Sequence, residues 1–453
     1  MRTRRPTRRA ATAASGPALP AAVLRAGVAA GLCLASAAGA QEQKKQPPPE
    51  FSSGYVPPTV FEPGPRAAAF AVLDVVVLLA VLGLSAYFAH AKRSRRDLRV
   101  LVVFSALYFG LYRQGCTCSV GSIQNVALAL CDSRYALPFA AGAFFLVPLV
   151  FALFAGRVFC AAACPLGAIQ DLVVLRPRRV PARVDHALSV LPYVVLGAGV
   201  LFAATDSAFV ICQYDPFIPL YRFGGGAAAT VLGVALLLIG TVVARPYCRY
   251  LCPYGVLLRW MTVFARWRVR ITPKDCVQCH LCADECPFGA IRPPTLEPVR
   301  EERAASRRRL GRLVLLTPLV VVLSAGLGRL AAPTLARMHH TVRLADRLYL
   351  EQSGRVRGTT DDSAAVYRQG RPVGEVYGEA LAVRRRFDLG APILGAWMGL
   401  VVCLKLIHLS IRRQRHDYEA DPAACLSCAR CYLSCPVEHE RLQGLVRLHE
   451  VKR

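Results

Sequence analysis

The sequence is poor in acidic residues: 29 Asp and Glu stand against 56 Lys and Arg, which gives a net charge of +27. A charge of this sign would suit nucleic acid, but no basic helix interleaved with aromatic residues accompanies it, so we expect no nucleic-acid partner. The sequence also shows no phosphate-binding loop, activated nucleophile or general acid. These absences leave no candidate catalytic residue.

Apolar residues are abundant, at 54% of the 453 residues, and they form stretches of about 20 residues that are typical of membrane spans. Much of the positive charge lies just beyond such stretches, as in the run His90 to Arg96, where anionic lipid and the positive-inside rule explain it. We expect seven spans, at about residues 67 to 89, 99 to 114, 136 to 156, 187 to 206, 226 to 244, 310 to 331 and 389 to 411.

A signal peptide and two exported segments accompany these spans. Residues 1 to 40 have the arginine-rich start, the apolar stretch and the small-residue site of a secretory signal peptide, with an uncleaved helix as the alternative. Residues 41 to 66, rich in Gln and Pro, read as a periplasmic linker. Residues 332 to 388 read as a periplasmic insert, in which alternating apolar residues around Gly370 suggest a β-hairpin and a solvated loop is the alternative.

Two cysteine runs, beginning at Cys276 and Cys425, fit the pattern C-x2-C-x2-C-x3-C-P of [4Fe-4S] proteins. In this pattern the fourth cysteine binds the cluster of the other run, so two crossed clusters are expected. One takes Cys276, Cys279, Cys282 and Cys435; the other takes Cys425, Cys428, Cys431 and Cys286. A pair of zinc sites is the alternative, although it leaves the x3-C-P part unexplained.

These runs divide a two-cluster ferredoxin-like domain into two halves, at residues 268 to 300 and 412 to 453. Its strands are expected around Arg268 to Thr272 and Val446 to Val451. The transmembrane helices 301 to 331 and 389 to 411 and the periplasmic insert separate the halves. Alternation of the spans returns both halves to the cytoplasmic side, where they can share ligands.

The membrane domain, residues 67 to 267, contains a second pair of motifs. Cys160 and Cys164 form a C-x3-C-P sequence after one span, and Cys248 and Cys252 repeat it after another, which indicates an internal duplication. Since C-x3-C on a helix places both thiols on one face, the four cysteines are candidates for a further metal site. They are also candidates for redox thiols whose pKa is lowered by Arg157 or Arg245. Structural turns with bystander thiols are the alternative.

Alternation places Cys116, Cys118 and Cys212 outside and the two C-x3-C-P motifs inside. External cysteines favour a disulfide, and a copper or redox thiol site at Cys116 and Cys118 is the alternative.

Taken together, these motifs resemble the bacterial membrane polyferredoxins of the NosR/NirI and NapH type, over roughly residues 65 to 440. The resemblance rests on the two C-x3-C-P repeats, Gly115 to Asn125, Cys212 to Phe217 and the two ferredoxin runs. The resemblance implies an inner-membrane protein of anaerobic respiration that passes electrons, from quinol, toward a periplasmic reductase or its maturation machinery. NosR-like proteins carry a large flavin-binding domain before the spans. Only about 26 residues stand there in this sequence, so we expect no flavin within this chain and a separate flavoprotein partner.

We therefore expect an all-α polytopic membrane protein, with about seven transmembrane helices after a signal peptide and a split cytoplasmic two-cluster ferredoxin-like α+β domain. Its function would be electron transfer between the quinone pool, or a cytoplasmic donor, and a periplasmic reductase system. Whether it forms part of a quinol dehydrogenase stays open. The alternative is a copper reductase or an assembly factor for a respiratory metalloenzyme, resembling the CcoG type.

Overall fold

The computed structural model describes residues 68–115, 118–271, 276–295, 303–411, 415, 417–440 and 444. The predicted signal peptide and periplasmic linker, Cys116 and residues 446 to 451 lie outside these residues. Each predicted span contains a helix. These are α2 (Ala68–His90), α3 (Arg95–Ser105) with the π-helix η1 (Ala106–Tyr112), α5 (Phe139–Ala155), α8 (Leu191–Ala204), α11 (Ala227–Gly240), α15 (Arg303–Ala336) and α18 (Val373–Ser410).

Four helical stretches in the described part are both long and apolar enough to cross a membrane: Ala69–His90, Ala182–Ala204, Ala305–Ala336 and Val373–Ser410. The second includes the short α7 (Ala182–Leu188) before α8. Three shorter apolar helices, Ser119–Cys131, Phe139–Ala155 and Ala227–Gly240, pack among them. The protein is thus a helical membrane protein, and the count of seven spans stays a prediction.

Segments that we expected as external loops fold back into the bundle. The first contains α4 (Ser119–Cys131), which packs against α5 and α8; the second contains α9 (Val210–Gln213) and α10 (Ile218–Arg222). The hydroxyl of Tyr221 donates a hydrogen bond of 2.7 Å to the carbonyl oxygen of Pro165, in the first C-x3-C-P motif. The same ring lies so close to Gly110 that a Cβ there would be 2.3 Å away. These contacts are inside the protein, because Tyr221 is buried.

Each C-x3-C-P motif lies between two short helical segments. The first joins η2 (Phe159–Ala163) to α6 (Pro165–Leu172), and the second joins α12 (Pro246–Tyr250) to α13 (Tyr254–Val263). Pro165 occupies the first turn of α6, where a proline loses no helical hydrogen bond. The proline therefore lets the chain turn sharply at the second cysteine and begin a new helix.

The ferredoxin-like part consists of α14 (Leu281–Glu285), β1 (Ile291–Arg292), β2 (Glu419–Ala420) and α19 (Arg430–Leu433). Strands β1 and β2 pair antiparallel, with Ile291 opposite Ala420. The predicted strand at Arg268 to Thr272 is wrong over residues 268–271, which form no strand, and Thr272 is not described. The strands instead follow the first cysteine run and precede the second, so their pairing brings the two runs together.

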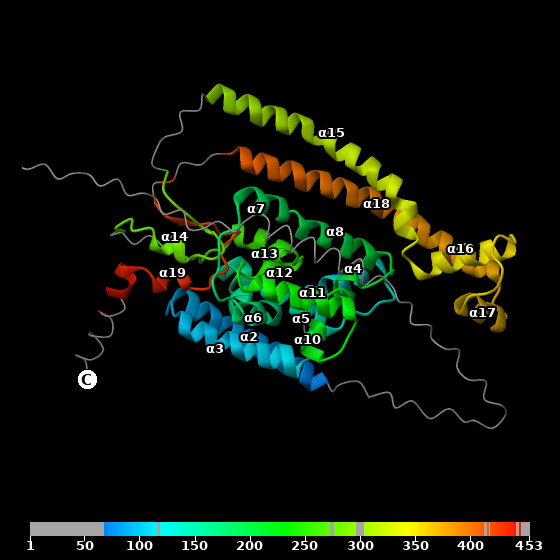
Figure 1. The fold of residues 1–453 in the computed structure, drawn as a ribbon, viewed down its shortest axis with the longest axis horizontal. Coiled ribbons are helices and arrows are strands. Elements are labelled where there is room, and N and C mark those ends of the chain that lie inside the picture. The colour runs from blue at the N-terminus through cyan, green and yellow to red at the C-terminus, as the bar shows by residue number, and fades with distance from the viewer. Residues whose placement is uncertain are drawn as a thin grey trace, which may run out of the picture.

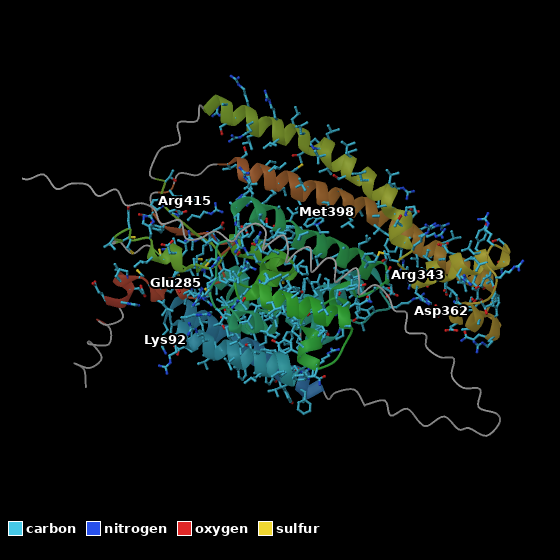
Figure 2. All side chains as sticks on the ribbon, viewed as in Figure 1. Lys92, Glu285, Arg343, Asp362, Met398 and Arg415 are labelled. Carbon is cyan, nitrogen blue, oxygen red and sulfur yellow. The ribbon has the colours of Figure 1, made fainter. Side chains whose placement is uncertain are left out.

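The predicted insert is helical. Helices α15 and α18 pack along each other, and α16 (His340–Gln352) and α17 (Asp361–Arg368) join them with a small core of their own, which includes Val342, Leu348 and Val376. The predicted β-hairpin is wrong, because Thr360 and Ser363 form a capping box that starts α17 at Asp361. This small helical unit lies at the opposite end of the molecule from α14 and α19 (Figures 1 and 2).

Candidate metal centres

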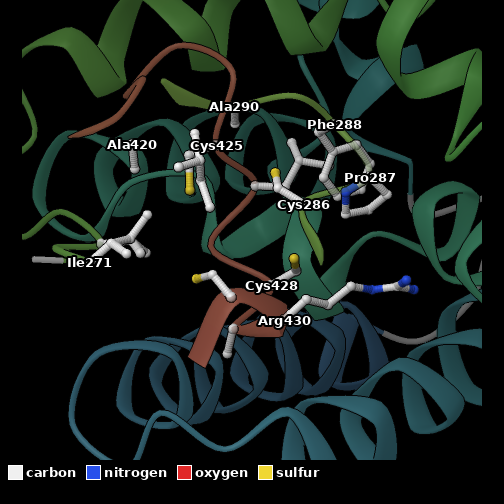
Figure 3. A pocket seen from close by; sticks show the side chains of 14 residues that line it. Ile271, Cys286, Pro287, Phe288, Ala290, Ala420, Cys425, Cys428 and Arg430 are labelled. Carbon is white, nitrogen blue, oxygen red and sulfur yellow. The ribbon is translucent and has the colours of Figure 1, made fainter. Parts of the chain in front are cut away.

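One cavity joins the two cysteine runs. Cys425, Cys428 and Cys431 line it together with Cys286, the last cysteine of the first run. Figure 3 shows Cys286 beside Cys425 and Cys428, with Arg430 reaching away from them. Ile271, Phe288 and Leu426 make the rest of the wall apolar. Four cysteines from both runs around one apolar space form a donor set that suits a [4Fe-4S] cluster.

A second cavity has the reciprocal composition. Cys276, Cys279 and Cys282 line it together with Cys435, the last cysteine of the second run. His280 and Tyr418 close one side, and the Tyr418 hydroxyl hydrogen-bonds to the Nδ1 atom of His280. Each cavity is therefore lined by three cysteines of one run and the last cysteine of the other, and that these eight cysteines bind clusters stays a prediction.

The two runs have the same backbone conformation. Positive φ angles occur at Gln278 (50°) and His280 (63°) in the first run, and at the equivalent Ser427 (53°) and Ala429 (58°) in the second. Residues other than glycine rarely adopt such angles, and they cluster at binding sites. The turns direct backbone amides at sulfur: Ser427 N donates to Cys425 Sγ at 3.4 Å.

Around Cys286 the amides of Phe288, Ala290 and Ile291 play the same part. These amide donors suit anionic sulfur ligands, because hydrogen bonds to sulfur stabilise negative charge and tune a cluster.

The C-x3-C-P cysteines also come together. The thiols of Cys160, Cys164, Cys248 and Cys252 lie near enough for their charges to interact, and three of the four are buried while Cys248 is partly buried. Gln170 Nε2 lies 3.2 Å from Cys248 Sγ, and Arg157 Nη2 lies 3.8 Å from Cys160 Sγ.

The expected lowering of thiol pKa by the adjacent arginines is wrong for Cys248. Burial raises the pKa of this thiol to about 11, although Arg245 acts in the opposite direction. Burial likewise raises the pKa of Cys252 well above its usual value. As free groups, these thiols would stay protonated, which disfavours activated redox thiols.

The arginine of each C-x3-C-P repeat lies against the other repeat. Arg245 of the second repeat donates hydrogen bonds to the carbonyl oxygens of Cys160 and Ala161 in the first. A Cβ on Gly167 would lie 3.4 Å from Arg245 Nη1, and a Cβ on Gly255 would lie 3.3 Å from Arg157 Nη2. The C-P-x-G glycine of each repeat therefore leaves room for the arginine of the other repeat, so the two motifs pack together as one unit.

A buried carboxylate connects this unit to the ferredoxin-like part. Asp171, on α6, forms ion pairs with Arg95, with Arg245 (3.3 Å) and with Arg430 (3.2 Å), which lies between Cys428 and Cys431. Burial raises the pKa of Asp171, but the three guanidinium groups outweigh it and hold the pKa well below its usual range. Nothing in the sequence marks this residue, because an isolated Asp beside a span looks like an ordinary solvated charge.

The structure brings Cys118, which we expected outside, close to Cys164, which we expected inside. The Cys118 thiol lies near enough to Cys164 for their charges to interact, and also near Cys212. The cause is the inward folding of the loops that carry Cys118 and Cys212. Among the described residues, Cys118, Cys131 and Cys212 form no disulfide with one another, and the remaining external candidate, Cys116, lies outside the described residues, so the expected disulfide stays a prediction.

A larger cavity of about 810 Å³ lies beside these sites. Val401 and Leu404 of α18 give it an apolar wall, and Trp260, Trp397 and Tyr193 form an aromatic cluster with ring centroids 5.7 to 6.4 Å apart. Its lining also includes Cys248 of the C-x3-C-P unit and Phe288 and Leu426, which flank Cys286 and Cys425. Its size is typical of a cavity for a small organic ligand.

Comparison with known proteins identifies these motifs. A 4Fe-4S binding domain family matches residues 137–183 and 226–272, which contain the two C-x3-C-P motifs, and a second 4Fe-4S binding domain family matches residues 269–292. No solved structure matches the chain significantly.

Curated relatives share these regions. The chain is 28% identical to an uncharacterised protein of Methanocaldococcus jannaschii over 40% of the chain and 77% of that protein. It is 32% identical to the protein NirI of Paracoccus denitrificans over 31% of the chain and 23% of NirI. It is 31% identical to the regulatory protein NosR of Pseudomonas aeruginosa over 48% of the chain and 33% of NosR.

The chain therefore spans only a quarter to a third of the length of the NirI and NosR proteins. In this chain, both the C-x3-C-P repeats and the first ferredoxin run fall in regions that match 4Fe-4S binding domains. The comparisons confirm the resemblance: the chain contains 4Fe-4S binding domains and is similar to the NosR/NirI type of membrane polyferredoxin.

Proposed function

We propose that the protein holds two [4Fe-4S] clusters with crossed ligands and passes electrons between the quinone pool, or a cytoplasmic donor, and a periplasmic reductase system. The carrying observation is the grouping of the eight cysteines, three from one run and one from the other around each of two cavities. When bound, the clusters supply one-electron exchange. The protein's own residues ligate them, direct backbone amides at the sulfurs and exclude water from an apolar wall.

The crossed arrangement makes a specific prediction. Anaerobically purified protein should contain about eight irons in its ferredoxin-like part, and reduction should give a spin-coupled EPR spectrum from the paired clusters. Cys435→Ser should perturb the cluster of Cys276, Cys279 and Cys282, whereas Cys286→Ser should perturb the other. Either substitution should remove the spin coupling, because only one intact cluster remains.

Cys403→Ser provides the matched control, since this buried cysteine lies in α18 outside both cavities. Zinc in place of iron, or an unchanged spin-coupled spectrum in both Cys435→Ser and Cys286→Ser, would contradict the proposal.

The 810 Å³ cavity is our candidate quinol site. Its apolar wall on α18 suits a hydrophobic ring and tail, while Asp185 and His186 in the same lining provide groups that accept protons released on quinol oxidation. Val401 is 6% exposed and faces this cavity. Val401→Trp should therefore fill the space and slow cluster reduction by a quinol analogue at least tenfold.

Leu389→Trp is the control, on an exposed position of the same helix. Reduction by dithionite should be unaffected in both variants, because dithionite does not need the cavity. Equal quinol rates in Val401→Trp and the wild type would remove the cavity from the proposal and leave the clusters in place.

A further inference from the structure

We infer that Cys160, Cys164, Cys248 and Cys252 together hold a third [4Fe-4S] cluster inside the membrane domain. The inference rests on the proposed electron-transfer function. It differs from that proposal in its ligands, which come from the duplicated C-x3-C-P motifs, and in its position among the apolar helices.

The first argument is the placement of the thiols. Each repeat contributes two cysteines, the four thiols lie near enough to one another for their charges to interact, and Cys160, Cys164 and Cys252 are 7% to 9% exposed. Within the described residues, no three His, Cys, Asp or Glu side chains converge closely enough to share a single metal ion. A cubane binds each cysteine through a different iron, so its four ligands stand around the cluster and need not meet at one point.

The second argument is charge. Four thiolates around a [4Fe-4S] core leave a net negative charge, which burial opposes unless cations lie nearby. Arg157 and Arg245 supply them, at 4% and 1% exposure. In the described part of the chain, the Nε–H of each has no hydrogen-bond partner, although the groups are buried. Such groups are rare in proteins, and an anionic group at this site would accept from them or offset their charge.

The third argument is the way the two repeats complete each other. Arg245 bonds to the backbone of Cys160, and glycines 167 and 255 leave space for the opposing arginines. One repeat alone therefore provides two thiols without the arginine of its partner. The duplication builds one shared site with four ligands, in place of two independent sites with two ligands each.

The position of these four cysteines suits electron transfer to or from the ferredoxin-like part. Arg157 contacts Cys160 Sγ at 3.8 Å and donates a hydrogen bond of 3.2 Å to the carbonyl oxygen of Ala423, two residues before Cys425. A single side chain thus connects this site to the nearer ferredoxin cavity. Cys118 also lies near this site, close enough to Cys164 for their charges to interact. A cluster here would divide a path through a hydrocarbon core about 30 Å thick into shorter steps.

The test is metal analysis of the anaerobically purified full-length protein. We expect about twelve irons and twelve acid-labile sulfides per chain in the wild type, against about eight of each when Cys160 and Cys252 are replaced by Ser. Loss of cluster absorbance should scale with this iron loss. In the same variant, the spin-coupled EPR spectrum of the ferredoxin clusters should persist, which verifies that the protein is folded.

A second variant separates ligation from folding. Cys403→Ser should keep about twelve irons, because Cys403 is buried in α18 away from the repeats. About eight irons in both the wild type and the Cys160/Cys252 variant, or copper in place of the extra iron, would overturn the third cluster and leave the proposed function intact. Absence of iron from every variant, including the wild type, would overturn both.

Discussion

Asp171 connects the membrane domain to the ferredoxin-like part through ion pairs. Its carboxylate, 3% exposed, pairs with arginines from α3, from the second repeat and from the second cysteine run. Removing one partner of a buried ion pair leaves its counterions uncompensated and costs about 3 to 5 kcal/mol. We therefore expect Asp171→Asn to lower the thermal midpoint of the detergent-solubilised protein and to release iron on heating before the helices unfold.

Asp388→Asn is the matched control. Asp388 also pairs with an arginine, Arg329, but its side chain is 45% exposed. Exposed pairs contribute about 0 to 1 kcal/mol, so the control should unfold close to the wild type. The low pKa of Asp171 adds a pH dependence. Its stabilisation is present above the unfolded-state pKa and is lost as pH falls through the depressed folded-state pKa, so acid should not release it until well below pH 4. Equal midpoints for the two Asn variants would contradict this role.

At the level of whole elements, the pair α15 and α18 depends on glycines that let two backbones touch. A Cβ on Gly395 of α18 would lie 2.1 Å from the carbonyl oxygen of Ser324 on α15, and a Cβ on Gly328 of α15 would lie 2.2 Å from that of Ala391. Small residues at such crossings are typical of membrane helices. Because backbone atoms cannot rotate away, Gly395→Val should force the helices apart and destabilise the protein by more than about 1 to 3 kcal/mol, the usual cost of overpacking.

Gly378→Val is the control, since a Cβ at Gly378, on the same helix, would meet nothing within 4 Å. Helix α18 also delivers the second cysteine run to the first. Gly395→Val should therefore reduce iron occupancy of both ferredoxin cavities, measured as iron per chain, whereas Gly378→Val should not. Full occupancy in Gly395→Val would show that the two halves meet without the helix pair.

At the level of the whole molecule, the long helices separate two ends. Helices α15 and α18, of 34 and 38 residues, are about 51 and 57 Å long, well beyond the hydrocarbon thickness of about 30 Å. The unit of α16 and α17 and the ferredoxin-like part lie at opposite ends (Figure 1). We expect a protease site inserted at Gly358 to be cut in intact spheroplasts, and the same site after Gly444 to be cut only once the membrane is opened. Cleavage of both sites in intact spheroplasts would contradict the orientation.

The sequence was sufficient for much of this architecture. The crossed grouping of cysteines could be predicted because the x3-C-P spacing itself encodes the exchange of the fourth ligand. Helices in the spans followed from hydropathy. The position of Cys118 could not be predicted, because counting alternating spans treats each connection as a surface loop, whereas α4 and α10 fold back into the bundle. The capping pair Thr360 and Ser363 indicates a helix start and so argues against the predicted β-hairpin. We gave more weight to the alternating apolar residues around Gly370.

Each ferredoxin cavity is lined by cysteines that lie far apart in the sequence, which has a consequence for biogenesis. Cys276 and Cys435, which line the same cavity, are separated by the whole α15 to α18 hairpin. At a synthesis rate of roughly 5 to 20 residues per second, the first run waits on the order of ten seconds or more before its partner leaves the ribosome. During that interval its thiols are exposed and oxidisable. If the eight cysteines bind clusters as proposed, we expect cluster insertion to follow membrane integration of this hairpin, and a cell starved of iron to accumulate an inserted but empty protein.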